Sequence, residues 1–214
     1  MPKQLSQIKL LLIVAFIGAA GVAFGQKEKD YESISIAQGL SQGMVFDMLQ
    51  DAEGFIWIAT KNGLNRYDGY SFKIFTNDPY NDHTLSSNTI IKLFEDSKGR
   101  IWAGTENAGV NIYDKKAGIF YRITHAPSNP NSLSGNGIKT MEEMPDGRML
   151  IATDAAGLNI VTITSDFLEK DLLPPVTRLS LPNNSQVYGM GKDKTGKIWI
   201  GGMDGMVYRF DPGN

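Results

Sequence analysis

The sequence predicts an all-β protein built from propeller blades, each made of four antiparallel strands. One glycine-punctuated segment occurs four times, and its turn glycines lie 45, 48 and 49 residues apart, at Gly54, Gly99, Gly147 and Gly196. Each unit holds four short apolar runs separated by Gly, Asn or Asp, as short strands joined by tight turns require. Repeats of this length with four strands each are typical of propellers.

The repeat spacing divides the chain into about four blades. In the first unit we predict strands at 44–51, 55–60, 64–68 and 71–77, separated by the turns AEG, KNG and GY. An orphan outer strand is predicted at 31–39; in a closed ring it would complete the last blade, with 33–37 pairing with 206–210. The expected blades span 40–84, 85–132, 133–184 and an incomplete 185–214.

Glycine and tryptophan columns are expected to have structural roles. The turn between the first two strands of a blade needs a residue at positive φ, which Gly54, Gly99, Gly147 and Gly196 can adopt. Three residues later the chain has Trp57, Trp102, Leu150 and Trp199. Large rings at one repeat position favour packing of blade against blade, and the alternative is a surface on which sugars stack.

Composition and the first 25 residues indicate an exported protein that does not bind nucleic acid. Lys and Arg number 21 against 23 Asp and Glu, so there is no basic surplus for phosphate backbones. After Lys3 and Lys9 comes an apolar run at 10–24, and Ala23 and Gly25 supply small residues for cleavage. We therefore predict a signal peptide at 1–25 and a periplasmic location. The run is shorter than the roughly 18 residues that a membrane span needs, so we expect no span in this chain.

Catalysis is not expected, because the residues that would carry it are missing or scattered. There is no cysteine, the two histidines His83 and His125 are isolated, and neither a G-x-S-x-G elbow nor a phosphate-binding loop occurs. We expect no catalytic residue, no metal site and no cofactor. The D-x-x-G-x-I-W hairpins resemble the Asp boxes of sialidase propellers, but Arg100 and Arg148 occupy equivalent turn positions and are not expected to converge on a carboxylate.

The repeat unit resembles the two-component regulator propeller repeat, with high specificity in the first two units and less in the third. That family's repeat has a leading G-L-S, a D-x-x-G-x-I-W hairpin and a G-L-N-x-Y-D strand. The third unit departs from the pattern at Met144, Leu150 and Thr162. The matching segments are 39–41, 51–57 and 63–68 in the first unit, and 85–86, 96–102 and 109–114 in the second.

The resemblance implies the periplasmic sensor region of a hybrid two-component histidine kinase of the Bacteroidetes type. Such proteins usually carry about fourteen repeats in two seven-bladed propellers, followed by an immunoglobulin-like domain, a membrane helix and a kinase. We therefore expect an N-terminal fragment of a larger seven-bladed propeller, an open arc whose unpaired edge promotes association, for example as a homodimer. The expected partners are the remaining repeats and the kinase portion of the parent protein.

The ligand is expected to be an oligosaccharide released from a polysaccharide, bound on one face of the propeller. The loops after the second strands and the long links between blades gather there. For any single residue the alternative is a plain turn former. Two other functions stay open, a secreted propeller glycan hydrolase or lyase and a periplasmic protein-interaction platform. The candidate ligand-binding residues are Lys61, Asn62, Glu106, Asn107, Asp154, Asp204, Tyr80 and His83.

Overall fold

A computed structural model describes residues 31–155, 157–164, 167 and 173–213. Residues 34–214 form one compact unit, separate from residues 1–33. The predicted signal peptide at 1–25 lies outside the described residues. The account that follows concerns the compact unit.

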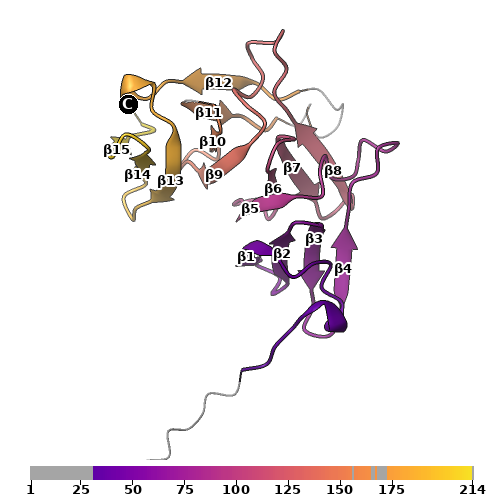
Figure 1. Cartoon of the computed structure of the whole chain (residues 1–214). Coiled ribbons are helices and arrows are strands. Elements are labelled where there is room, and N and C mark those ends of the chain that lie inside the picture. Colours follow the sequence, from indigo (N-terminus) through magenta and orange to yellow (C-terminus); the bar gives the residue numbers. More distant parts are fainter. Residues whose placement is uncertain (1–30, 156, 165–166, 168–172, 214) are drawn as a thin grey trace, which may run out of the picture. The chain divides into compact units, whose positions relative to one another are not determined.

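Fifteen strands in the described residues form four antiparallel sheets, so the predicted all-β fold of four-stranded blades is confirmed (Figure 1). Three sheets have four strands in chain order and the last has three. The first sheet is β1 (Val45–Gln50), β2 (Ile56–Thr60), β3 (Gly63–Tyr67) and β4 (Phe72–Phe75). The second is β5 (Ile90–Glu95), β6 (Ile101–Thr105), β7 (Val110–Asp114) and β8 (Ile119–Ile123). The third is β9 (Ile138–Glu143), β10 (Met149–Thr153), β11 (Leu158–Val161) and β12 (Val176–Leu179). The fourth is β13 (Val187–Lys192), β14 (Ile198–Gly202) and β15 (Val207–Phe210).

The four sheets share one register, which lets equivalent residues be compared. The first strand of each sheet pairs with the second through an interrupted ladder, with the irregularity at the same place in every sheet. The turn glycines take the predicted positive φ, for example 93° at Gly54 and 73° at Gly99. A residue with a Cβ would be strained there, which explains the repeated glycine.

Each sheet packs on the next, and the tryptophan column lies in these interfaces. Trp57 clusters with Leu85, Ile90 and Ile101 of the second unit. Trp102 clusters with residues of the third sheet, and Leu150 with residues of the fourth. Trp57 and Trp102 have no exposed surface, so neither ring offers a face on which a sugar could stack. Dispersion and apolar burial between sheets are therefore the main stabilising contributions in this disulfide-free chain.

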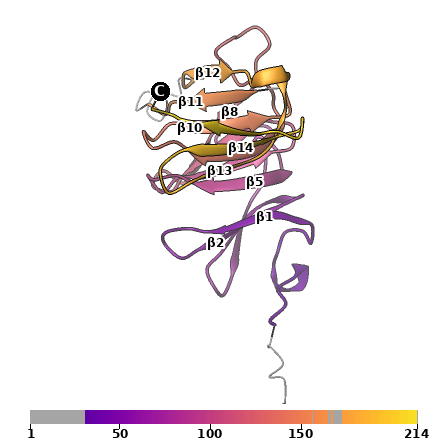
Figure 2. The same cartoon turned by 90° about the vertical axis from the view of Figure 1, so that its left-hand side faces the viewer.

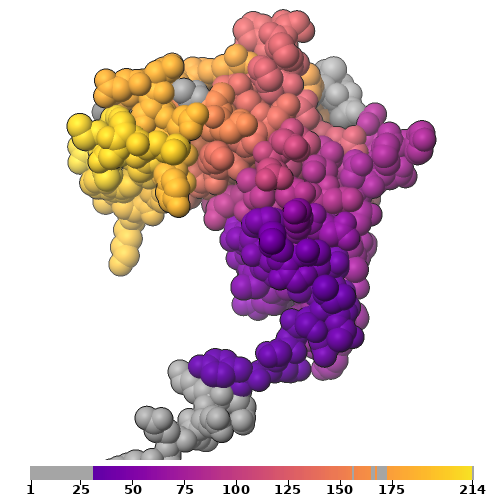
Figure 3. Space-filling model, in the orientation of Figure 1, coloured from indigo at the N-terminus to yellow at the C-terminus, as the bar shows by residue number. Residues whose placement is uncertain are grey.

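The sheets follow one another without closing into a ring. The inner strands contact in chain order, β1 with β5, β5 with β9 and β9 with β13. The last sheet presents β13 and β14 to the viewer in Figure 2. In the space-filling view the last strands, in yellow, lie at the surface with no other described segment over them (Figure 3). The open arrangement predicted for a partial propeller is thus what the structure shows.

The predicted outer strand at 31–39 is wrong. Residues 31–35 have no regular structure, and a 3-10 helix, η1 (Ile36–Gln38), follows them. Ser35 caps this helix through its hydroxyl, which accepts a hydrogen bond from the Ala37 amide at 3.2 Å. An isolated segment becomes a strand only when a partner strand satisfies its backbone groups, and none of the described strands pairs with it. A second 3-10 helix, η2 (Pro182–Asn184), precedes β13.

Candidate functional site

The D-x-x-G-x-I-W hairpins are locked by an aspartate that binds its own tryptophan. Asp51 Oδ1 accepts hydrogen bonds from the Glu53 and Phe55 amides at 3.0 and 2.9 Å. Asp51 Oδ2 accepts one from Trp57 Nε1 at 2.8 Å. Asp96 and Asp193 repeat the arrangement with Trp102 and Trp199, each also at 2.8 Å. The aspartate therefore orients the ring for packing, and this part of the motif is structural.

Charged groups around the first hairpin complete this structural role. Lys115 Nζ lies 2.9 Å from Asp51 Oδ2 and 3.2 Å from carboxylate oxygens of Glu53 and Glu95. Burial raises the pKa of Asp51, but hydrogen bonds from Trp57 and Lys115 outweigh it, so the pKa lies below its ordinary value. Arg100 and Arg148 pair with Asp96 and Asp146 of their own hairpins and do not converge.

The lowered pKa of Asp51 predicts a loss of stability in acid. A depressed carboxyl pKa contributes stability above the unfolded pKa of about 4, and this contribution is lost as the pH falls through the lower folded value. We expect the free energy of unfolding in urea to fall from pH 5 toward pH 2, and to fall less steeply in Asp51→Asn. An equal slope in both proteins would contradict this role of Asp51. Glu106→Gln, at an exposed carboxylate that makes no hydrogen bond or ion pair with other described residues, is the control.

The loops after the second strands form a continuous row, which we call the loop row. Its members are Lys61–Asn62, Glu106–Asn107, Asp154 and Asp204. The Thr89 hydroxyl donates to the Lys61 carbonyl at 3.4 Å, and the Thr89 carbonyl accepts from the Glu106 amide at 3.2 Å. The Gln186 side-chain amide donates to the Asp154 carbonyl at 2.9 Å. The main-chain carbonyl of Gln186 accepts from the Met203 amide at 2.8 Å. One residue at the start of an inner strand thus joins two successive loops.

A glycine in the third unit lets the middle of the loop row close up. A Cβ on Gly137 would lie 2.7 Å from Asp154 Cγ and 2.8 Å from the Glu106 carbonyl oxygen. Without that Cβ, the Asp154 amide donates to the Gly137 carbonyl at 2.6 Å and Asp154 Oδ1 accepts from the Gly137 amide at 3.1 Å. The second and third loops therefore meet at Gly137.

The candidate residues of the loop row divide into engaged and available side chains. Asp154 accepts from Gly137, and Asp204 accepts from the Met206 amide and the Tyr208 hydroxyl. These two hydrogen bonds hold the Asp204 carboxylate in a turn. The hydrogen bond from Tyr208 also lowers the pKa of Asp204. The side chains of the first two loops are exposed and make no hydrogen bond or ion pair with other described residues. They belong to Lys61, Asn62, Glu106 and Asn107.

The structure places Tyr80 and His83 elsewhere, on the link between the first and second sheets, with His83 against the outer strand of the second sheet. The His83 carbonyl accepts from the Phe120 amide at 2.9 Å, and its ring lies 6.3 Å from that of Tyr121. Tyr80 is fully exposed in the same link between sheets. His83 also lines a shallow pocket with Phe75 and Phe120. No hydrogen bond, ion pair or ring contact among the described residues joins either side chain to the loop row, so the structure does not bring the eight candidates together.

Arginine residues that the sequence analysis missed hold these links in place. Arg122 Nε donates to the Thr84 carbonyl at 2.9 Å, and its Nη2 donates to the Leu85 carbonyl at 3.0 Å. Arg178 binds the next link in the same way, with the Ser132 and Leu133 carbonyls both at 2.9 Å. Arg122 and Arg178 occupy the same position on the fourth strands of two successive sheets. This recurrence in the sequence was the signal that could have revealed their role.

A buried asparagine column was missed as well. Asn65, Asn111 and Asn159 are fully buried, each in the third strand of its sheet. Asn111 Oδ1 accepts from the Ser86 amide at 2.8 Å, and its Nδ2 donates to the Ser86 hydroxyl at 3.0 Å. In the first three blades these residues anchor the serine of the L-S dipeptide that opens the blade.

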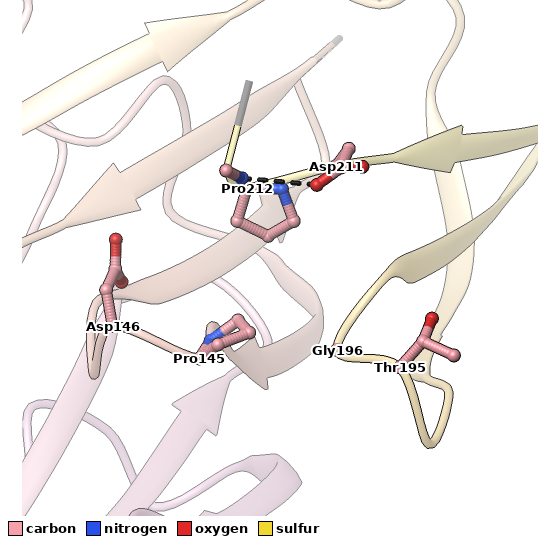
Figure 4. Close-up of a pocket in the computed structure, with 7 residues that line it drawn as sticks. Pro145, Asp146, Thr195, Gly196, Asp211 and Pro212 are labelled. Atoms are coloured by element: carbon pink, nitrogen blue, oxygen red, sulfur yellow. Dashed lines mark hydrogen bonds between the residues drawn. The ribbon is translucent and has the colours of Figure 1, made fainter.

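At the opposite end of the strands, the hairpin turns of the third and fourth sheets border a pocket of about 280 Å³ (Figure 4). Pro145 and Gly196 come from the two turns, and Asp211 and Pro212 from the segment after β15. A Cβ on Gly196 would lie 2.8 Å from Pro145 Cγ, so the turns touch only because Gly196 lacks one. Asp146 is already paired with Arg148 at 2.6 Å. The pocket therefore reflects turn packing and adds no chemical group to the loop row.

Among the described residues no cluster of three or more His, Cys, Asp or Glu could hold a metal ion. The described helices include none with the length and apolar character of a membrane span.

Comparison with known proteins identifies the repeats. The family of two-component regulator propellers matches residues 39–62 and 84–107. A histidine kinase, P4 of Formosa agariphila, is 41% identical over 56 residues, which are 26% of this chain and 4% of that protein. The match thus spans a small fraction of the kinase.

Solved structures show the fold. The extracellular domain of the hybrid two component system BT3049 from B. thetaiotaomicron is 23% identical, with a TM-score of 0.60 over 85% of this chain and 30% of that chain. That of BT4673 is 21% identical, with a TM-score of 0.61 over 80% of this chain and 22% of that chain. Virginiamycin B lyase from Staphylococcus aureus is 17% identical, with a TM-score of 0.52 over 78% and 55% of the two chains. This chain spans less than a third of either extracellular domain.

Proposed function

We propose that this chain is part of the ligand-sensing region of a hybrid two-component sensor, located in the periplasm, because two of its repeats match the family of two-component regulator propellers. The histidine kinase match and the two extracellular domains support this proposal. The kinase would lie in the rest of the parent protein, so this chain contributes recognition. The resemblance to virginiamycin B lyase is one of fold and gives no reason to assign a lyase activity.

We infer that the ligand is an oligosaccharide and that the first two loops of the loop row bind it. The observation that carries this inference is the set of exposed, unengaged polar side chains on two adjoining loops, joined through Thr89. Lys61 and Glu106 offer a cation and an anion, and Asn62 and Asn107 offer donors and acceptors together. Sugar hydroxyls need such mixed donors and acceptors on a fixed frame. Asp154 and Asp204 are held in turns and serve as framework.

Calorimetric titration of the purified chain with a panel of polysaccharide-derived oligosaccharides tests this function. We expect one class to bind, and the double variants Lys61→Ala/Asn62→Ala and Glu106→Ala/Asn107→Ala to weaken the Kd at least tenfold, which is about 1.4 kcal/mol. The double variant Tyr80→Ala/His83→Ala is the matched control, because both residues belong to the link between the first two sheets and not to the loop row. Unchanged affinity in both loop variants, or loss in the control alone, would contradict the assignment. No binding by any oligosaccharide would favour the protein-interaction platform.

A further inference from the structure

The inner strand of every sheet carries a bulge at the end that borders the loop row. In the first sheet Val45 pairs with Thr60 at the end of β2, and the next paired residue is Asp47. Phe46 therefore lies outside the ladder, beside the start of the first loop. A bulge leaves its extra residue unpaired and re-aims the side chain. Counting the other three sheets, the bulge residues are Phe46, Ile91, Lys139 and Tyr188.

The bulge residues reach solvent even where a sheet lies on each side of them. β5 contacts β1 and β9, and β9 contacts β5 and β13. Ile91 on β5 is nevertheless partly exposed, and Lys139 on β9 is exposed. Their paired neighbours Ile90 and Ile138 are fully buried. Solvent access is therefore a property of the bulge, and Phe46, at the same position of β1, is 43% exposed.

An ion pair holds the first two bulges next to each other. Asp47 directly follows Phe46, and Lys92 directly follows Ile91. Lys92 Nζ lies 2.9 Å from Asp47 Oδ2, and the same oxygen accepts a hydrogen bond from the Leu93 amide at 2.9 Å. The third and fourth sheets have an uncharged residue at this position, so the ion pair cannot recur between the later sheets. It fixes the bulges of the first two sheets in particular.

Phe46 and Ile91, which we call the apolar ledge, border the two loops whose polar side chains are available. The Met44 carbonyl, two residues before Phe46, accepts a hydrogen bond from the Lys61 amide at 3.2 Å. Ile91 has the same relation to the second loop, through the carbonyl of Thr89. Next to the other two loops, whose carboxylates are engaged, the bulge residues are a lysine and a tyrosine. An apolar surface bordered by a few fixed polar groups is the usual composition of a small-ligand site.

The charges around the apolar ledge cancel. Lys61 and Glu106 of the two loops are one cation and one anion, and Asp47 and Lys92 are paired with each other. An anionic ligand would therefore gain no net attraction here. A neutral pyranose suits both parts of the surface, because its face of C–H groups packs on apolar side chains and its rim of hydroxyls needs donors and acceptors.

We propose that the apolar ledge is the floor of the ligand site and that the ligand is a neutral oligosaccharide. One pyranose face rests on the Phe46 ring, the neighbouring unit rests on Ile91, and the hydroxyls meet the side chains of the first two loops. This inference rests on the proposed function, to which it adds two binding residues and the charge class of the sugar.

Calorimetric titration tests the proposal, with cellotetraose, xylotetraose and mannotetraose as neutral probes and the tetramer of galacturonic acid as the acidic probe. We expect a neutral tetramer to bind and Phe46→Ala to raise its Kd at least about tenfold. Ile91→Ala is expected to raise the Kd about threefold or more. Tyr188→Ala is the matched control, because it removes an 81% exposed ring from the bulge of the last sheet, and it is expected to leave the Kd unchanged.

Phe46→Trp gives a second measurement that does not depend on loss of binding. The variant keeps an aromatic ring on the ledge, so we expect its Kd to stay within about threefold of that of the unsubstituted chain. Its new indole lies at the sugar, and its fluorescence is expected to change during the titration. The emission of the unsubstituted chain is expected not to change, because Trp57 and Trp102 are fully buried and Trp199 lies on the last sheet.

The outcomes separate this inference from the proposed function. Binding that the loop variants weaken and that Phe46→Ala leaves unchanged would overturn the ledge alone. Equal losses in Phe46→Ala and Tyr188→Ala would overturn its placement on the first two sheets, and preference for the acidic tetramer would overturn the neutral ligand. If the unsubstituted chain binds none of the probes, the ledge fails together with the oligosaccharide assignment.

Discussion

Trp102→Ala is expected to lower the free energy of unfolding by about 3–5 kcal/mol, the range for truncating a large buried aromatic side chain. Trp102 is fully buried between the second and third sheets, and its indole N–H is bound by Asp96. The substitution leaves a cavity in this interface and removes one of the two hydrogen-bond partners of Asp96 Oδ2, the other being Arg100 Nε. Trp57→Ala is expected to behave alike, because Trp57 holds the same position between the first two sheets. Urea unfolding followed by circular dichroism measures both.

Trp199→Ala is the matched comparison for this prediction. Trp199 has the same aspartate hydrogen bond at 2.8 Å, but it is 45% exposed because none of the described sheets covers it. We expect a loss of roughly 1 kcal/mol or less, because a half-exposed ring loses less packing when it is truncated. If Trp57→Ala and Trp102→Ala kept full stability and lost sugar binding instead, the tryptophan column would be a stacking surface and the packing account would be wrong.

Asn111→Ala is expected to lower the free energy of unfolding by roughly 1–3 kcal/mol, because it leaves buried polar groups without partners. Asn111 binds both the amide and the hydroxyl of Ser86, and its Nδ2 lies 3.4 Å from the Ala103 carbonyl. Ser86 opens the second blade, so the variant also loosens the start of that unit. Asn62→Ala, at an exposed loop position, is the control and is expected to change stability by less than about 0.5 kcal/mol. Equal effects of the two substitutions in urea unfolding would contradict the anchoring role.

The fold could be predicted because its signals are local and repeated. Positive φ at Gly54 and Gly99 is a property of one turn, and the strands around it are short apolar runs whose pattern recurs. An aspartate that accepts backbone amides is typical of such turns, and Asp51 accepts the amides of Glu53 and Phe55. Its bond to the indole nitrogen of Trp57 was not foreseen, because that contact depends on how the ring turns to meet the next sheet.

The errors lie where a segment depends on distant partners. The segment 31–39 resembles the outer strands in sequence, yet a strand forms only beside another strand, and none of the described strands lies beside this segment. The path of the link that carries Tyr80 and His83 is set by Arg122, which lies about 40 residues later in the chain, beyond any local pattern. The loop row itself was predicted as a set of loops, but which of its side chains are engaged follows from tertiary contacts such as that of Gly137 with Asp154.

The central claim is that each tryptophan of the column is buried only where a following sheet covers it. The most direct measurement is the ¹⁹F NMR spectrum of the chain labelled with 5-fluorotryptophan, recorded in H₂O and in D₂O, with the three resonances assigned by Trp→Phe variants. We predict that the resonance of Trp199 shifts with the solvent isotope, while those of Trp57 and Trp102 do not. A solvent isotope shift at Trp57 or Trp102 as large as that at Trp199 would contradict the account.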